Sequence, residues 1–264
     1  MNGIELNRSE LQQDGHTASE NVYIISDEYP IPRLATTRRI WIYLPPDYHA
    51  ETKSYPVLYM HDGQNLFDNH SASFGEWGVD EYLDSVGKPE IIVVGIDHGN
   101  NERLLEYNPY DSEHGVGKGN AYVDFLVYNL KPYIDSNFRT QKGASCTSIA
   151  GSSMGGLISM YAAVKYPDVF GNAGVFSPAF WMAPAIFSFA EEKELPGSSG
   201  FYFICGDLES GQMVPDMEKM ASIIAQKNLK QGSLKVEVIV GGRHEEKLWQ
   251  ESFPKFYQWL MATC

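Results

Sequence analysis

Apolar and polar positions alternate along the chain in a way that predicts strands separated by helices. Short apolar or alternating runs bounded by Pro, Gly or polar residues are typical of strands. The segments with this pattern are 38–44, 55–60, 90–96, 145–150, 172–176, 201–205 and 234–240. Apolar residues at helical spacing mark the segments 122–134, 157–164, 216–226 and 249–260. Pro215 is a start signal for the third helix, and Pro254 is expected to bend the last helix or to mark its start.

Repeated strand–helix units predict an α/β fold, in which a mostly parallel sheet is covered by helices on both faces. The β-branched run 90–96 is typical of a strand that is buried on both faces. The stretches 69–78 and 98–120 are rich in Gly, Asn, Ser and His, so we expect surface loops there. Loops at the ends of strands are where sheets of this kind build their sites.

Composition and charge restrict the classes of protein. The chain has 264 residues, of which 43% are hydrophobic and 13% aromatic, and this predicts a single globular domain over residues 1–264. Within it we expect a polar N-terminal segment over 1–25 and a core over about 38–260. The formal net charge of −14 argues against nucleic acid and membrane partners, because both require a basic face. A small-molecule partner is expected, and the sequence carries no signal for the oligomeric state.

The N-terminal segment and the cysteines bear on the cellular compartment. Residues 1–25 carry charged side chains and no continuous apolar run, which predicts a cytoplasmic protein unless a leader has been removed. The cysteines, Cys146, Cys205 and Cys264, are odd in number, and two of them lie in strand-like runs. We expect all of them to be free thiols without a catalytic role.

The stretch 151–155, Gly-Ser-Ser-Met-Gly, has the Gly-x-Ser-x-Gly pattern of a nucleophile elbow. It lies between a predicted strand and a predicted helix, which is the context that the motif requires. The glycines let the helix pack close to the strand, so that the serine hydroxyl is exposed at the turn. Ser153 has a glycine two positions before it and another two positions after it, whereas Ser152 does not. We therefore predict that Ser153 is a nucleophile.

A serine hydroxyl needs a base to take its proton, and usually an acid to orient that base. In the α/β-hydrolase order, the acid and then the histidine follow the serine in the chain. His244 is the one histidine after Ser153, and it comes soon after the predicted strand 234–240. We predict that His244 is the general base; the alternative is an exposed loop histidine.

The acid is expected in the loop after the predicted strand 201–205. Asp207 and Glu209 both lie in this loop, and both are candidates to orient His244. Asp207 also suits an ordinary turn or a helix cap. The loop pattern alone leaves the choice open.

Two backbone N–H groups are predicted to stabilise the oxyanion that forms during acyl transfer. The N–H of Met154 follows the nucleophile, and the N–H of Gln64 lies in the loop after strand 55–60. Gly63 would let this backbone approach a substrate closely.

His61 and Asp62, in the same loop, suggest a metal site or a catalytic pair as an alternative. Because they are adjacent, their side chains would point to opposite faces of a strand. The chain also shows no metal-ligand spacing. We therefore expect no metal at this loop.

Several motifs in order resemble the putative esterase family, a branch of the α/β-hydrolases that includes esterase D, feruloyl and acetyl xylan esterases and the enterobactin esterases. They are YPVLYMHDGQNLF at 55–67, RLLEY at 103–107, GSSMGG at 151–156 and FSPAFW at 176–181. The resemblance runs from about residue 38 to about residue 260. It implies the α/β-hydrolase fold and a cofactor-independent serine hydrolase that acts on carboxylic esters.

The resemblance also implies roles for single residues. Ser153 would be the nucleophile and His244 the general base, and Glu209 is favoured over Asp207 as the acid. This chain departs from the family pattern at one point, because Arg243 stands between the paired glycines and the histidine, which in the family commonly follows those glycines directly. A second point concerns the acid: some enterobactin-esterase relatives work with a serine–histidine pair alone, which puts the role of Glu209 in doubt.

Trp181 and Arg103 match positions that line the substrate site in the family. The alternatives are core packing for Trp181 and an ion pair with Glu106 for Arg103. Together with Trp77 and Tyr107, Trp181 is a candidate for stacking on a sugar or phenolic ring.

Three functions are therefore compared. The first is a carboxylic ester hydrolase, acting on a carbohydrate-linked, phenolic or siderophore-type ester. The second is an acyltransferase that uses the same serine and passes the acyl group to an alcohol other than water. The third is a non-catalytic binding protein on the same scaffold. The intact set of Ser153, His244 and an acid loop argues against the third, and an assay with and without added sugar acceptors would separate the first two.

Overall fold

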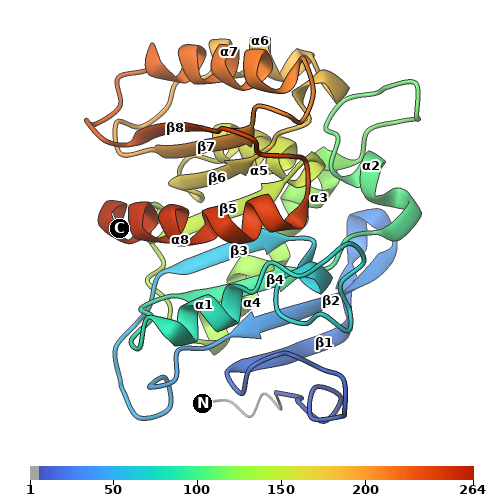
Figure 1. Cartoon of the computed structure of the whole chain (residues 1–264), viewed down its shortest axis with the longest axis vertical. Coiled ribbons are helices and arrows are strands. Elements are labelled where there is room, and N and C mark those ends of the chain that lie inside the picture. The colour runs from blue at the N-terminus through green and yellow to red at the C-terminus, as the bar shows by residue number, and fades with distance from the viewer. Residues whose placement is uncertain (1–5) are drawn as a thin grey trace.

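The computed structural model describes residues 6–264, which form one eight-stranded sheet with the order β1-β2-β4-β3-β5-β6-β7-β8 (Figure 1). The strands β1 and β2 are antiparallel, as are β2 and β4, and every other neighbouring pair is parallel. The predicted mostly parallel sheet is thus confirmed. The strands are β1 Val22–Ile31, β2 Thr36–Tyr43, β3 Val57–His61, β4 Ile92–Ile96, β5 Thr147–Ser152, β6 Asn172–Phe176, β7 Gly200–Gly206 and β8 Leu234–Ile239.

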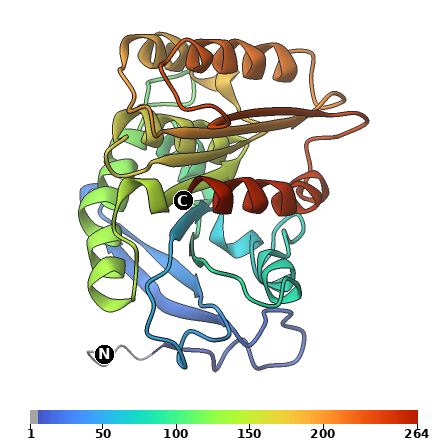
Figure 2. The same cartoon turned by 90° about the vertical axis from the view of Figure 1, so that its left-hand side faces the viewer.

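Helices cover both faces of the sheet. Figure 2 shows α1 and α8 on one side of the strands and the α3–α4 region on the other. The helices are α1 Val79–Ser85, α2 Arg103–Glu106, α3 Gly119–Phe125, α4 Lys131–Asn137, α5 Met154–Lys165, α6 Ala185–Glu192, α7 Met213–Ala225 and α8 Glu246–Thr263. Among residues 6–264, no helix is both long enough and apolar enough to cross a membrane.

The two faces of the sheet bury separate hydrophobic cores. Strand β4 shows how: Val94 packs into the core under α3–α7, whereas its neighbour Val93 packs into the core under α1 and α8. Side chains of successive strand residues point to opposite faces, so a strand between two cores needs apolar residues at every position. This explains the continuous β-branched run in the sequence.

The sheet begins earlier in the chain than the predicted core, at Val22 rather than near residue 38. β1 is an edge strand whose pairing with β2 is interrupted by two register shifts, and its burial alternates irregularly. That irregularity hides the strand pattern. The predicted polar segment 1–25 therefore overlaps a strand, and its first five residues lie outside the described part of the chain.

Other boundaries differ in detail. The predicted helix 122–134 runs from α3 through a π-helical turn at Leu126–Leu130 into α4. Pro254 lies inside α8, which starts at Glu246, so Pro254 does not mark the start of that helix. The predicted loop 98–120 contains the short helix α2 and buried residues.

The prediction of three free cysteines is wrong for two of them. Cys146, just before β5, forms a disulfide with Cys264 at the end of α8, and their Cα atoms are 5.0 Å apart. The two residues are 118 positions apart in the sequence, so no local pattern could pair them. Cys205, in β7, is a free and buried thiol, as expected.

Candidate active site

Ser153 lies at the sharp turn between β5 and α5, with φ 57° and ψ −119°. A non-glycine residue adopts positive φ only at a cost, and such strain is concentrated at functional sites. The strain is held by backbone hydrogen bonds on both sides of the residue. The Ser153 N–H donates to the carbonyl of Phe176, and the Ser153 carbonyl accepts from the N–H of Ala179 at 3.0 Å.

The glycines of the motif permit close packing of α5 on the sheet. A Cβ at Gly151 would lie 3.0 Å from backbone atoms of Gly155 and from the His61 ring. A Cβ at Gly155 would lie 3.2 Å from a carboxylate oxygen of Asp62. Larger side chains would therefore push the helix away from the strand and move Ser153.

His244 lies in the loop between β8 and α8, and its Nδ1 is 2.6 Å from Oε2 of Glu209. The side chain of Glu209 is 1% exposed, whereas that of His244 is 34% exposed. A buried carboxylate on Nδ1 fixes the ring and leaves Nε2 to exchange a proton with a substrate or a serine. Asp207, the alternative acid, instead accepts a hydrogen bond from the Gly241 N–H at 2.7 Å and so stabilises the turn after β8.

Glu209 is held by groups that sequence reasoning did not single out. Its Oε1 accepts hydrogen bonds from the Gly206 N–H at 2.6 Å and from the Ser177 hydroxyl at 2.7 Å. The indole N–H of Trp249 in turn donates to Ser177 Oγ. The Trp249 ring also stands at 90° to the ring of His244, with centroids 5.2 Å apart.

The two predicted oxyanion donors lie at starts of helices. Met154 is the first residue of α5, so its N–H has no partner within the helix. Gln64 is in the 3₁₀ turn η2, Gly63–Asn65, directly after β3 and Asp62. The Gln64 side chain accepts a hydrogen bond from the His98 N–H at 3.3 Å, which ties this turn to the loop after β4.

Arg103 does not pair with Glu106, so that alternative is wrong. Its Nε and Nη2 donate to the two carboxylate oxygens of Asp62 at 2.7 and 2.8 Å, while Glu106 pairs with Arg38. Asp62 has a left-handed conformation with φ 57° and immediately precedes the turn that carries Gln64. The ion pair therefore anchors that turn.

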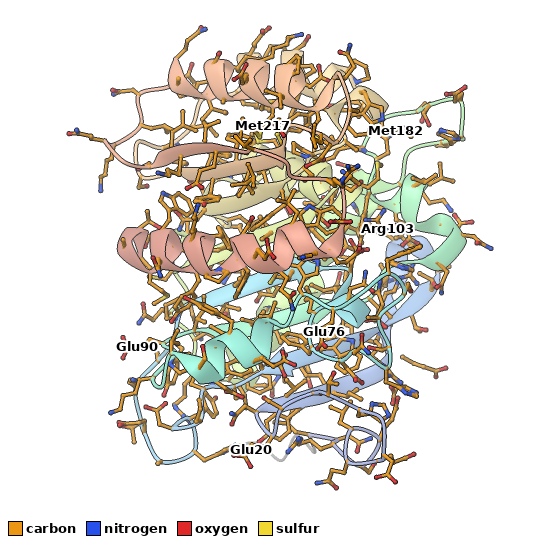
Figure 3. All side chains as sticks on the ribbon, viewed as in Figure 1. Glu20, Glu76, Glu90, Arg103, Met182 and Met217 are labelled. Carbon is orange, nitrogen blue, oxygen red and sulfur yellow. A yellow bond between two sulfur atoms is a disulfide. The ribbon has the colours of Figure 1, made fainter. Side chains whose placement is uncertain are left out.

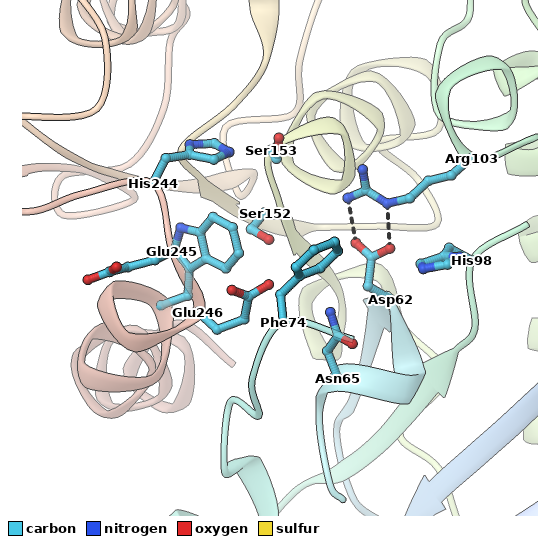
Figure 4. A pocket seen from close by; sticks show the side chains of 11 residues that line it. Asp62, Asn65, Phe74, His98, Arg103, Ser152, Ser153, His244, Glu245 and Glu246 are labelled. Carbon is cyan, nitrogen blue, oxygen red and sulfur yellow. Dashed lines mark hydrogen bonds and ion pairs between the residues drawn. The ribbon is translucent and has the colours of Figure 1, made fainter. Parts of the chain in front are cut away.

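Ser153, His244 and Arg103 line one cavity of about 440 Å³, together with Asp62, Asn65, Phe74, His98, Ser152, Glu245, Glu246 and Trp249. In Figure 4 the His244 ring and the Asp62–Arg103 pair stand on opposite sides of this cavity, with Ser153 between them. In the described part of the chain no hydrogen bond joins Ser153 to His244. Such contacts are often long before a substrate binds.

The aromatic candidates divide into two groups. Trp77 and Tyr107 are buried, so the expectation that they stack on a substrate is wrong. Trp181 is 41% exposed and, with Glu209, Met213 and His244, lines a smaller adjoining cavity of about 170 Å³. Phe74, which sequence reasoning missed, is 81% exposed at the wall of the larger cavity.

Burial and charge set the protonation of groups beneath the site. Burial lowers the pKa of His61 to about 3, and its Nδ1 lies 2.9 Å from the Tyr122 hydroxyl, so His61 is neutral. Burial alone would raise the pKa of Asp62, but the Arg103 charge and hydrogen bonds outweigh it and lower that pKa. Neither His61 nor Asp62 belongs to a group of potential metal ligands among residues 6–264.

Comparisons with known proteins agree with this architecture. The family model described as Putative esterase matches residues 31–260. The uncharacterized protein YbbA of Bacillus subtilis is 27% identical over 245 residues, which cover 86% of this chain and 93% of YbbA.

Solved structures share the fold. The BES protein from Bacillus cereus superposes with a TM-score of 0.73 at 21% identity, covering 92% of this chain and 95% of that one. The enterobactin esterase FES from Shigella flexneri superposes with a TM-score of 0.70 at 18% identity, covering 93% of this chain and 58% of that one. The predicted α/β-hydrolase fold is confirmed.

Proposed function

We propose a serine mechanism for this chain, which belongs to the Putative esterase family of carboxylic ester hydrolases. The observation that carries the proposal is the shared cavity: the strained Ser153 lines it together with His244, whose Nδ1 is hydrogen-bonded to the buried Glu209. In this proposal Ser153 is the nucleophile, His244 the general base and Glu209 the orienting acid.

The first half-reaction transfers the acyl group to the enzyme. The Ser153 hydroxyl gives its proton to Nε2 of His244 as Oγ bonds to the carbonyl carbon of the ester. The carbonyl oxygen becomes an oxyanion, stabilised by the N–H groups of Met154 and Gln64. Collapse of this intermediate breaks the bond to the alcohol oxygen, which leaves with the proton from His244.

The second half-reaction releases the acid. Water gives a proton to His244 and attacks the acyl carbon, a second oxyanion forms at the same donors, and Ser153 leaves with the proton. Glu209 keeps Nδ1 protonated throughout and stabilises the positive ring that forms in each half-reaction.

For the substrate we propose a small-molecule ester that carries a ring. Phe74 and Trp181 are exposed aromatic side chains, each in one of the two cavities that His244 lines, and such side chains stack on phenolic or sugar rings. The one guanidinium nitrogen of Arg103 that does not bind Asp62 is available to an oxygen of the substrate. Carbohydrate-linked, phenolic and siderophore-type esters all have these features.

Labelling with a fluorophosphonate probe tests the nucleophile. We expect one covalent adduct on Ser153 and none on Ser153→Ala, together with a loss of kcat of at least about 1,000-fold. An adduct that persists in Ser153→Ala, or no adduct on the wild type, would overturn the assignment. The same assay is repeated with an added sugar or glycerol as acceptor. Acyl transfer to this alcohol at a higher rate than hydrolysis would identify an acyltransferase.

A matched pair of variants tests the acid. Glu209→Gln is expected to lower kcat by about 100-fold or more, because the amide cannot stabilise the positive imidazole. Asp207→Asn keeps the turn and is expected to leave kcat within about twofold of wild type. A loss confined to Asp207→Asn would reverse the roles of the two side chains.

The number of domains and the cellular location are also proposals. The eight strands of one sheet support a single domain. A cytoplasmic location is less well supported, because cytosolic thiols are kept reduced and Cys146 and Cys264 form a disulfide.

A further inference from the structure

Three carboxylates gather at the start of α1, away from the catalytic groups. Glu76 precedes the helix and is labelled in Figure 3, and Asp80 and Glu81 lie in its first turn. One oxygen from each carboxylate lies within 4.8 Å of the other two. Acidic residues in a first turn are favourable for a helix, but that effect does not require them to be buried or to converge.

Two of these carboxylates, those of the half-buried Glu76 and the buried Asp80, each have a buried oxygen atom that has no partner. Asp80 is 0% exposed; its Oδ2 accepts the Ser19 N–H at 2.7 Å, and its Oδ1 accepts nothing. Glu76 accepts the Thr17 hydroxyl at Oε2, and its Oε1 is buried without a partner. Within residues 6–264, no lysine, arginine or histidine forms an ion pair with any of the three.

Such an arrangement is costly unless something neutralises it. An unpaired buried carboxylate loses its hydration, and neighbouring carboxylates repel each other in a medium of low dielectric constant. Burial, followed by the charge of Glu81, raises the pKa of both Glu76 and Asp80, to about 7 for Glu76. A cation at the centre of the group would remove both costs.

We propose that Glu76, Asp80 and Glu81 bind a calcium ion. Calcium takes carboxylate oxygens at about 2.3–2.6 Å, so ligands on opposite sides of the ion stand up to about 5 Å apart, which suits this group. Magnesium demands a near-ideal octahedron and is usually held by only one or two carboxylates, so a group of three carboxylates suits it less well. Glu81 is exposed, so the ion has a path from solvent and room for water ligands.

The position of the site gives calcium a structural effect on the cavity. Asp80 and Glu76 contact Ser19 and Thr17, so an ion here would join the segment before β1 to α1. It would also fix the loop 69–78, which carries Phe74 to the cavity wall.

The residue after Glu76 links this site to the catalytic groups. The N–H of Trp77 donates to the carbonyl of Asn65, a residue of the cavity wall, at 2.8 Å. Its ring packs on Trp249, with centroids 5.8 Å apart. Calcium is therefore a means of ordering one wall of the active site without contact with the substrate.

Terbium binding tests the proposal directly, because terbium replaces calcium and its luminescence is excited by a nearby tryptophan, here Trp77. Protein stripped with a chelator is titrated with terbium and then with calcium. We expect sensitised luminescence that calcium displaces and that magnesium at the same ionic strength does not. Trp77→Phe should retain the calcium-induced change in Tm and lose most of the luminescence.

Thermal unfolding supplies the matched control. Calcium at about 1 mM should raise the Tm of the stripped wild type by at least about 3 °C. Glu81→Gln and Glu76→Gln should lose this rise and, without calcium, melt no lower than wild type, because each removes a repelling charge. Glu218→Gln, an exposed residue of α7, should behave as wild type. Absence of a calcium effect on both Tm and luminescence, or an equal effect in Glu81→Gln and Glu76→Gln, would overturn the proposal.

Discussion

The indole Nε1 of Trp249 lies 2.8 Å from the hydroxyl oxygen of Ser177, which it reaches from the first turns of α8 across 72 positions of sequence. Because Ser177 Oγ donates to Glu209, the acceptor of His244, the indole acts on the histidine through two intervening groups. The chain of donors leaves the carboxylate fully hydrogen-bonded while it is buried, and so fixes the oxygen that faces the imidazole.

Ser177→Ala is expected to lower kcat by about tenfold, since loss of one hydrogen bond to a buried charge is worth somewhat more than 1 kcal/mol. KM should stay within about twofold, because Ser177 does not line the cavity. Steady-state kinetics that resolve kcat from KM provide the check. Trp249→Phe keeps an aromatic ring and removes the indole N–H, so a smaller decrease in kcat is expected than for Ser177→Ala. An unchanged kcat in Ser177→Ala would show that this chain of hydrogen-bond donors does not control His244.

Arg103→Lys separates two roles of the arginine. Lysine cannot bind both oxygens of Asp62 at once, so the turn that carries the Gln64 N–H should loosen and kcat should fall by about tenfold. If Arg103 also binds the substrate, KM should rise as well. Measuring both constants with a catechol-type ester and with an uncharged acetyl ester distinguishes the roles: a KM effect alone, with kcat unchanged, would contradict anchoring of the turn.

Local patterns made much of the fold predictable. The elbow is readable because strand, serine turn and helix are consecutive, and β4 is readable because burial on both faces requires an unbroken apolar run. β1 was missed for the opposite reason: it lies at the edge, and its register shifts break the alternation that marks a strand.

The site was less predictable because its supports are distant in sequence. Chain order pointed to Ser153 and His244, but nothing near Asp62 indicates that Arg103, 41 positions later, binds it. The same holds for Ser177 and Trp249, which resemble ordinary core residues in a one-dimensional pattern. Trp77 and Tyr107 were expected to stack on the substrate, but both are buried. Residue type alone does not tell an aromatic side chain of the cavity wall from one in the core behind it.

His61 predicts how stability depends on pH. Its folded-state pKa, about 3, is below the unfolded value of 6.5, so only the unfolded chain takes up the proton. The contribution of His61 is therefore fully present above pH 6.5 and is lost as the pH falls, by up to about 1.4 kcal/mol per pH unit. Urea unfolding of the wild type between pH 6.5 and 5 should show this loss relative to His61→Asn.

The comparison must be made as a difference between the two proteins. Asp97, whose pKa burial raises to about 6, and Glu76 contribute slopes of the opposite sign in this range, because their folded forms bind the proton more tightly. These slopes are common to both proteins and cancel in the difference. Identical pH profiles for wild type and His61→Asn would mean that the buried imidazole can be protonated in the folded state.

The Cys146–Cys264 disulfide predicts both a thiol count and a stability change. In denatured protein without reductant, one thiol should react, that of Cys205, and three should react after reduction. In the native state none should react quickly, because burial raises the pKa of Cys205 to about 12.

The disulfide holds the end of α8 against the start of β5, so replacing both half-cystines by serine should reduce the free energy of unfolding by about 2–4 kcal/mol. Lysing cells directly into denaturant that contains the alkylating agent extends the count to the natural compartment: three reactive thiols there would favour a cytoplasmic protein, and one would favour an oxidising location.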